Sequence, residues 1–348
     1  MSYKLLGQGS FGIVITPPLN IHKTKKLNYV SKIIKKKINK KSKKNNESKK
    51  NNESKKNNES KKNNEFNISK KLSKIKNAEQ HFCIIEEMNV IKYNDIPSSI
   101  KKKSANVNKF FEYKDEKEYI SFLMPNCGVP ITTKETLKFL KVKNNFQDFI
   151  NHLLLSLKYL KQKKIVLGDI KLDNILIKNN KPILIDYGKS QIINKIYKNI
   201  HSLICSTGYY SPEMYLLDIL VYDEDNEKVK SKITHKNIID TIENDIVNDS
   251  YINEAAYDIC NKEDTKTIER LKKYYTLYKN KSFGNNLLKN LKKEMIYKCD
   301  IYSLGRTLED LYELLKMKNE KILALIQNMT EFNHEKRFSI EQCMEFIN

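Results

Sequence analysis

The sequence predicts an α+β protein with most of its strands before about residue 124 and most of its helices after it. Three observations lead to this class. Two short runs that contain β-branched residues, at 13–15 and 30–33, follow a glycine-rich segment near the N-terminus. A long apolar stripe at helical spacing occupies residues 146–164. A polar turn at 178–181 separates two apolar runs and predicts a hairpin within the helical half.

The composition of the chain limits its classes of partner. Only three of the 64 basic residues are arginine, although the formal net charge is +22. Proteins that read nucleic-acid sequence depend on the two-pronged hydrogen bonding of arginine, so no specific nucleic acid is expected as the main partner. No apolar run reaches membrane-spanning length and no signal segment precedes the first predicted strand, which predicts a soluble, cytoplasmic protein that does not bind membranes.

Cysteine and histidine spacing gives no indication of a structural metal. The six cysteines show no C-x-x-C pattern, and the six histidines show no paired ligand spacing, so a zinc site is not expected. Reduced thiols are the simplest expectation for an intracellular protein of this kind.

The glycine-rich segment near the N-terminus matches a phosphate-binding pattern. Gly7, Gly9 and Gly12 fit G-x-G-x-x-G, and Val14 completes the longer form G-x-G-x-x-G-x-V. Glycines at this spacing let a hairpin turn approach phosphate oxygens with its backbone N–H groups. A dinucleotide-binding fold uses the same glycines but needs a helix directly after the third one. Here β-branched residues and then two prolines follow, so a strand is predicted.

A second group of polar residues lies around the predicted hairpin. Asp169, Lys171 and Asn174 precede the hairpin, and Asp186 follows it at the start of Asp-Tyr-Gly. Asn174 and Asp186 are therefore expected at the two adjacent ends of the hairpin, close enough to share a cation. This order of residues resembles the catalytic loop and the Asp-Phe-Gly motif of the eukaryotic-type protein kinase superfamily.

The resemblance implies a bilobal protein-kinase fold, with a small β-rich N-lobe and a mainly α-helical C-lobe. Asp169 would accept the proton of a substrate hydroxyl, and Lys171 would steady the transferring phosphoryl group, as in serine/threonine kinases. Asn174 and Asp186 would bind Mg²⁺. The phosphates of ATP would lie under the glycine hairpin, whose residues are Gly7, Gln8, Gly9, Ser10, Phe11, Gly12 and Val14.

Two more N-terminal segments resemble nucleotide-positioning parts of the superfamily. Val-Ser-Lys-Ile around Lys32 resembles the strand whose lysine contacts the α- and β-phosphates. Apolar residues at helical spacing predict a helix over 78–91. Glu87 on this helix is the expected partner of Lys32, and Glu86 is the alternative.

The segment before the C-lobe resembles the hinge between kinase lobes. Residues 110–113 and 119–124 predict a hairpin whose second strand leads into this hinge. Met124 would guard the adenine pocket. Because Pro125 has no N–H, adenine would bond to the Pro125 carbonyl and to the backbone of Cys127.

Later segments resemble three further kinase motifs. The Ser-Pro-Glu segment ends at Glu213, and Ser206 before it falls at the position that touches the catalytic Asp and Lys, with Thr207 as the one-residue alternative. Asp300 is expected to begin a helix as its cap and to brace the catalytic loop. Arg337 is expected to form a buried pair with Glu213, where lysine would not substitute.

One motif departs from the family pattern. Leu167-Gly168 replaces the His-Arg that normally precedes the catalytic Asp. Because that arginine usually meets a phosphate on the activation loop, phosphorylation is not expected to act through this contact. Tyr187 replaces the phenylalanine of Asp-Phe-Gly and keeps an aromatic packing group.

The expected domain organisation has two lobes, each with an insertion. Residues 1–124 would form the N-lobe, with a disordered lysine- and asparagine-rich insert at about 36–70 that contains four copies of Ser-Lys-Lys-Asn-Asn-Glu. Residues 125–348 would form the C-lobe, with a helical insertion at about 214–298. Docking of a partner and simple packing are both open roles for that insertion.

The resemblance implies an ATP- and Mg²⁺-dependent kinase that phosphorylates serine and threonine in protein substrates. A pseudokinase scaffold and a small-molecule kinase are the alternatives. The lysine and asparagine bias, Pro17-Pro18 and the Leu-Gly-Asp loop resemble kinases of large eukaryotic DNA viruses, which would place the protein in host cytoplasm or in a virion.

Overall fold

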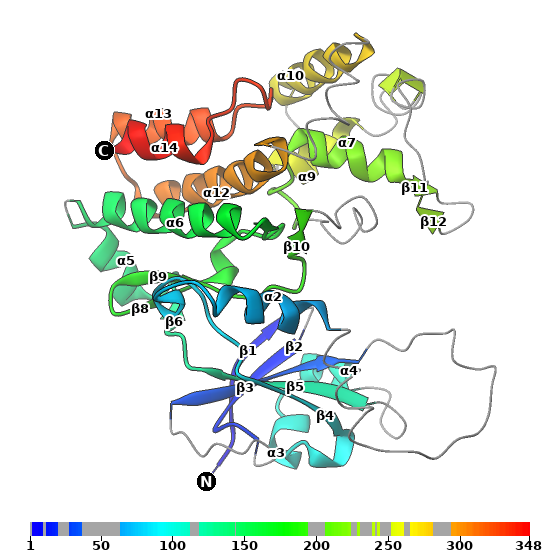
Figure 1. The fold of residues 1–348 in the computed structure, drawn as a ribbon, viewed down its shortest axis with the longest axis vertical. Coiled ribbons are helices and arrows are strands. Elements are labelled where there is room, and N and C mark those ends of the chain that lie inside the picture. The colour runs from blue at the N-terminus through cyan, green and yellow to red at the C-terminus, as the bar shows by residue number, and fades with distance from the viewer. Residues whose placement is uncertain are drawn as a thin grey trace. The chain divides into compact units, whose positions relative to one another are not determined.

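A computed structural model shows the fold of the chain (Figure 1). The structure describes residues 2–9, 12–19, 28–36, 63–111, 118–142, 144–193, 206–223, 228–229, 239–240, 242–243, 252–260, 265–280 and 294–348. The chain divides into two compact units. The first contains residues 1–79 and 83–127, and the second contains residues 80–82 and 128–348.

The first unit is built on a five-stranded antiparallel sheet in the order β1-β2-β3-β5-β4. Its strands are β1 (Lys4–Gly9), β2 (Gly12–Thr16), β3 (Tyr29–Lys35), β4 (Glu87–Lys92) and β5 (Glu118–Pro125). Ile13, Ile15 and Ile33 are fully buried on the central strands, which is the environment that favours β-branched residues. The two runs predicted as strands are thereby confirmed.

Short helices cover this sheet: α2 (Asn64–Leu72), η3 (Tyr93–Asp95), α3 (Ser98–Lys101) and α4 (Ala105–Phe110). Helix α2 begins where the Asn63 side chain accepts a hydrogen bond from the Phe66 amide. The ring of Phe66 packs against that of Phe122 on β5, with centroids 6.5 Å apart. The disordered insert expected at about 36–70 is therefore wrong over residues 64–70, which belong to this helix. Most of the repeat, at residues 37–62, lies outside the described residues.

Two predicted elements of this unit are wrong. The helix predicted over 78–91 is a single 3₁₀ turn, η2 (Ala78–Gln80), followed by irregular chain and strand β4. Of the hairpin predicted from residues 110–113 and 119–124, the second strand is present as β5, which pairs with β4. Phe110 instead ends α4, and residues 112–117 lie outside the described residues. Four apolar residues at spacing three are too few to separate a helix from a strand, and pairing along β5 decides the outcome.

The two cysteines of this unit form a disulfide. Cys83 and Cys127 are joined across 44 positions of sequence, with Cα atoms 5.8 Å apart. The expectation of reduced thiols is therefore wrong for this pair, whose spacing matched no disulfide or metal pattern. Cys299 and Cys343, in the second unit, are free and buried.

The second unit is mainly helical. Its longer helices are α5 (Lys134–Leu140), α6 (Asn145–Gln162), α7 (Pro212–Val221), α9 (Ile252–Cys260), α10 (Thr265–Thr276), α12 (Glu294–Leu315), α13 (Glu320–Met329) and α14 (Ile340–Ile347). Three small sheets accompany them: β6 (Val129–Pro130) with β8 (Ile175–Lys178) and β9 (Lys181–Leu184), β7 (Ile165–Val166) with β10 (Gln191–Ile192), and β11 (Tyr222–Asp223) with β12 (Lys228–Val229).

The predicted long helix and the predicted hairpin are both confirmed. Helix α6 buries its apolar stripe and packs with α14, and α12 packs with α13 and α14 (Figure 1). In the hairpin, Ile175 faces Leu184 and Lys178 faces Lys181. Gly128 makes the close approach to this hairpin, because it has φ +116° and a Cβ there would lie 2.1 Å from the Ile177 carbonyl oxygen.

The region around 214–298 contributes helices to the core of this unit. The helix predicted over 264–278 is confirmed as α10 with the following turn η8 (Leu277–Lys279). Leu271, Tyr275 and Tyr278 are fully buried, in one apolar cluster with Met214 and Tyr302. Within the described residues, no helix has both the length and the apolarity needed to span a bilayer.

Candidate active site

The loop after β7 is held by a buried carboxylate. The Leu167 and Gly168 amides donate to the two carboxylate oxygens of Asp300, at 2.8 and 2.9 Å. Burial raises the pKa of Asp300 to about 6, while these two hydrogen bonds act to lower it. Bracing of the loop by Asp300 is thereby observed. The predicted capping role is wrong, because α12 begins at Glu294 and continues through Asp300 with Met295 and Ile296 buried.

Asp169 and Lys171 meet at one hydroxyl group. The Ser206 Oγ donates to Asp169 Oδ1 at 2.7 Å, and Lys171 Nζ donates to Ser206 Oγ at 2.8 Å. The Ser206 amide also donates to Asp169 Oδ1 at 3.1 Å. Between the two alternatives of the sequence, the structure therefore brings Ser206 to the acid and the lysine.

Asn174 and Asp186 come together through the hairpin. Asn174 Nδ2 donates to the Asp169 carbonyl at 2.8 Å and to Asp169 Oδ2 at 3.2 Å. The Ile185 amide donates to the Asn174 carbonyl at 3.0 Å. This backbone hydrogen bond holds Asp186, the residue after Ile185, close to Asn174. Asp186 has φ +62°, a left-handed conformation that non-glycine residues rarely adopt and that often marks functional sites. Carboxylate and amide oxygens suit a hard cation such as Mg²⁺.

The aromatic residue after Asp186 is fixed by a hydrogen bond that phenylalanine lacks. Tyr187 is buried, and its hydroxyl donates to the Leu184 carbonyl at 2.9 Å. The buried hydroxyl thus has a partner, which removes the cost of replacing phenylalanine by tyrosine here.

In the first unit, Lys32 pairs with a residue that sequence analysis missed. Its Nζ lies 2.7 Å from Glu65 Oε1, and both side chains are buried. Glu65 belongs to the first turn of α2, where a carboxylate is favoured by the helix dipole. Glu87 instead lies on β4 opposite Leu123, and Glu86 accepts a hydrogen bond from Tyr29. The helix expected to carry Glu87 is therefore wrong, because this segment is strand β4, and the carboxylate found beside Lys32 is that of Glu65.

The glycine segment forms the tip of the β1–β2 hairpin, where Gly9 faces Gly12. A Cβ at Gly12 would lie 2.5 Å from the Ile33 carbonyl oxygen, so packing within the sheet requires this glycine. A Cβ at Gly7 or Gly9 would have no atom of the described residues within 4 Å, and neither glycine has a positive φ. Neither packing nor conformation requires glycine at these two positions, which fits close approach of a ligand.

Other predicted nucleotide-binding residues have the following places. Val14 faces Lys32 in the β2–β3 pair, and Gln8 accepts a hydrogen bond from Ser104 at 3.5 Å. Met124 faces Val30 near the end of β5. Cys127 is buried, with its sulfur in the disulfide. Ser10 and Phe11 lie outside the described residues.

A buried ion pair closes the segment that follows Ser206. Arg337 forms a two-pronged contact with Glu213, at 2.5 Å (Nη1–Oε1) and 2.9 Å (Nη2–Oε2), with both side chains fully buried. Arg337 holds the pKa of Glu213 below its usual value, although burial acts in the opposite direction. The predicted pair is present.

The model for the protein kinase domain family matches residues 1–346. The chain belongs to the protein kinase family. A search of the curated proteins found no match. The bilobal α+β kinase fold predicted from the sequence is confirmed by the family match together with a β-sheet N-terminal region and a helical C-terminal region.

Helix α10 contributes a contact that anchors the Ser-Pro-Glu segment. The Tyr275 hydroxyl on α10 donates to the Pro212 carbonyl at 3.0 Å, and both groups are buried. Tyr274 and Tyr278 contact His334 Nδ1 at 3.0 and 3.3 Å. The sequence indicated a helix here, but nothing in it linked these tyrosines to Pro212. Helix α10 therefore packs in the core of the second unit and contacts the Ser-Pro-Glu segment.

Proposed function

We propose that the chain is an ATP-dependent serine/threonine protein kinase. The observation that carries the proposal is the convergence of Asp169 and Lys171 on one hydroxyl, that of Ser206. A carboxylate in this position is able to accept the proton of an attacking substrate hydroxyl. An ammonium group beside it is able to neutralise charge on the transferred phosphoryl group. Lys171 also supports serine and threonine as acceptors, because a lysine two residues after the acid resembles the serine/threonine members of the family.

The residues that would hold the nucleotide and metal fit that chemistry. Gly7 and Gly9 leave open space beside their backbone, and the buried Glu65 holds the ammonium group of Lys32. Asn174 and Asp186 offer oxygen ligands for Mg²⁺. ATP would supply the phosphoryl group, with Mg²⁺ neutralising its charge, while this chain positions the acceptor and removes its proton.

A labelling experiment with a matched pair of variants tests the proposal. The purified chain is incubated with γ-labelled ATP, Mg²⁺ and a generic protein substrate, and the labelled amino acids are identified. We expect label on serine and threonine. Asp169→Asn should lower the rate by about 10²–10⁴-fold, which is the usual contribution of a general base. Asp173→Asn removes an exposed carboxylate four residues away and should keep most of the activity.

The Leu167-Gly168 sequence favours a second candidate, a pseudokinase scaffold, because it lacks the usual His-Arg. Nucleotide binding without any transfer of label would support the scaffold and contradict the kinase. Label found on a small molecule and on no protein would support a small-molecule kinase. The lysine and asparagine bias and the Leu-Gly-Asp loop support kinship with kinases of large eukaryotic DNA viruses, acting in host cytoplasm or a virion.

A further inference from the structure

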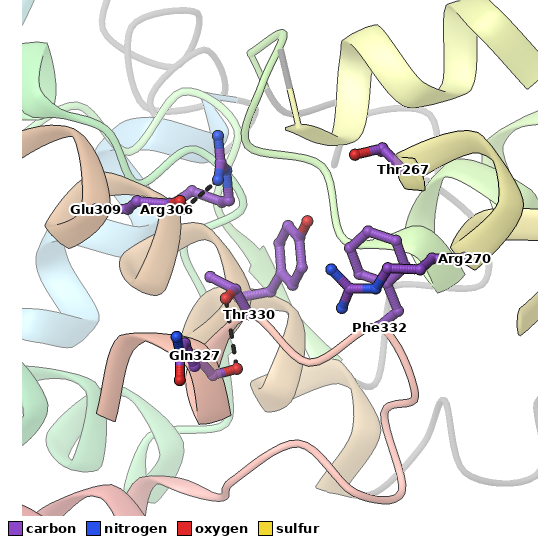
Figure 2. A pocket seen from close by; sticks show the side chains of 8 residues that line it. Thr267, Arg270, Arg306, Glu309, Gln327, Thr330 and Phe332 are labelled. Atoms are coloured by element: carbon purple, nitrogen blue, oxygen red, sulfur yellow. Dashed lines mark hydrogen bonds and ion pairs between the residues drawn. The ribbon is translucent and has the colours of Figure 1, made fainter. Parts of the chain in front are cut away.

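A small pocket opens beside α10 in the second unit. Its volume is about 190 Å³, and α10, α12, α13 and Phe332 form its walls (Figure 2). Thr267 and Arg270 come from α10, Arg306 and Glu309 from α12, and Thr330 from the end of α13. A volume of this size accepts one side-chain head group with a few waters.

Positive charge predominates among the residues that line the pocket. The lining contains two guanidinium groups and one carboxylate, so it carries a net charge of +1. The chain uses lysine for 61 of its 64 basic residues (64 minus three arginines), yet both cationic residues of this pocket are arginine. The planar fork of arginine binds carboxylate and phosphoryl oxygens in pairs, which lysine cannot do.

Arg270 is positioned to receive an anion. Its guanidinium lies over the ring of Phe332, 4.3 Å from the centroid, and this stacking orients the group while leaving its N–H edge available. In Figure 2 the guanidinium of Arg270 and the hydroxyl of Thr267 point toward the same space. Within the part of the chain that the structure describes, no carboxylate forms an ion pair with Arg270.

Arg306 connects the pocket to the catalytic residues. It forms an ion pair with Glu309, and its Nε donates to the Gly208 carbonyl at 3.2 Å. Gly208 is two residues from Ser206, which bonds to Asp169. Two residues span at most about 7 Å, so Gly208, the residue that Arg306 contacts, lies close to Ser206. A short peptide could therefore reach from the pocket to the proposed base, Asp169.

We propose that this pocket binds an oxyanion on the substrate peptide, a carboxylate or a phosphoryl group, a few residues from the acceptor hydroxyl. Arg270 is the residue that determines this specificity, and Arg306 forms the fixed wall. The proposal rests on the proposed kinase function. It assigns to the α10 insertion a role in substrate selection in addition to packing.

A peptide series with matched variants tests this proposal. Each peptide carries one acceptor serine, and glutamate, phosphoserine or glutamine is placed in turn at each flanking position. The variants are Arg270→Gln, Arg270→Lys and, as control, Lys273→Gln, which removes an exposed charge from the same helix. We expect the wild-type kcat/KM to be about three- to thirtyfold higher for an anionic residue at one position. This preference should disappear in Arg270→Gln, weaken in Arg270→Lys and persist in Lys273→Gln.

A binding measurement separates failure of this proposal from failure of the kinase assignment. Fluorescent peptides with alanine at the acceptor position report binding without phosphoryl transfer. If no peptide is phosphorylated, the proposed function fails, and selective binding lost only in Arg270→Gln still supports the pocket. Equal behaviour of Arg270→Gln and Lys273→Gln in both assays would overturn the proposal. Comparison of the glutamate and phosphoserine arms identifies which oxyanion is preferred.

Discussion

Lys32 and its partner show what single residues contribute to the candidate site. Lys32 is identifiable in a lysine-rich chain because Val30 and Ile33 frame it in a β-branched run. Glu65 is hidden, since it is the last residue of the fourth repeat copy, where identical glutamates occur every six residues. The structure places this glutamate in the helix that begins at Asn64, and the other three repeat glutamates lie outside the described residues.

For the single residue Glu65, we predict that Glu65→Gln lowers kcat/KM by about 10²-fold. The neutral amide no longer holds the buried ammonium group of Lys32 in place, and a displacement of about 1 Å in a positioning group has an effect of this size. Steady-state phosphorylation kinetics measure it. Glu87→Gln is the matched control, and an equal loss in both variants would contradict the assignment of Glu65.

Helices α10 and α12 show how whole elements build the site. Helix α12 braces the loop after β7 through Asp300, and its Ser303 donates to the Tyr209 carbonyl at 2.8 Å. Helix α10 supports the following segment through Tyr275 and Pro212. Both helices follow from apolar periodicity, but the groups they contact lie roughly 60 to 130 positions away in the sequence.

For α10 we predict that Tyr275→Phe reduces the free energy of unfolding by about 1–2 kcal/mol. The variant keeps the buried ring but leaves the Pro212 carbonyl without its observed donor, and an unsatisfied buried acceptor has a cost of this order. Urea unfolding measures the change. Tyr257→Phe on α9, where the tyrosine is exposed, should alter the free energy by less than about 0.5 kcal/mol.

At the scale of the molecule, the second unit includes a short segment distant from the rest of its sequence. Residues 80–82 belong to this unit, where the ring of His81 stacks on that of His152 with centroids 4.2 Å apart. His81 Nδ1 also hydrogen-bonds with Ser156 Oγ at 2.9 Å. Burial, together with nearby His152 and Lys181, lowers the pKa of His81 to about 4.

This histidine pair predicts that the protein is less stable at mildly acidic pH. Unfolded His81 takes up a proton near pH 6.5, whereas folded His81 resists protonation until about pH 4. The unfolded state therefore binds more protons across this window, and stability falls as pH falls from about 6.5 to 4. His334, whose pKa burial also lowers to about 4, acts in the same direction, and Asp300 acts in the opposite one.

The measurement is the unfolding free energy of wild type and His81→Asn at pH 7 and pH 5. Asparagine keeps a polar atom near Ser156 but cannot take up a proton. The loss of stability between the two pH values should be smaller in the variant by about 2 kcal/mol. The same pH dependence in both proteins would show that His81 does not contribute to it.

Local sequence order was enough to predict the fold class and the family resemblance, and to single out the residues around Asp169. These features depend on local order: a glycine hairpin, a strand lysine, and an acid, lysine and asparagine at fixed spacing around one β-hairpin. Residues that are close together in the sequence carry this information, and the β8–β9 register confirms the predicted hairpin.

The tertiary structure alone decided which distant groups meet. In the structure Lys32 pairs with Glu65, and Cys83 is joined to Cys127. Strand β4 occupies part of the segment predicted as a helix, and the Tyr275 hydroxyl contacts Pro212. Each outcome depends on which segments pack together. Which segments pack together depends on the burial and hydrogen bonding of whole helices and strands. A pattern of a few neighbouring residues does not carry this information.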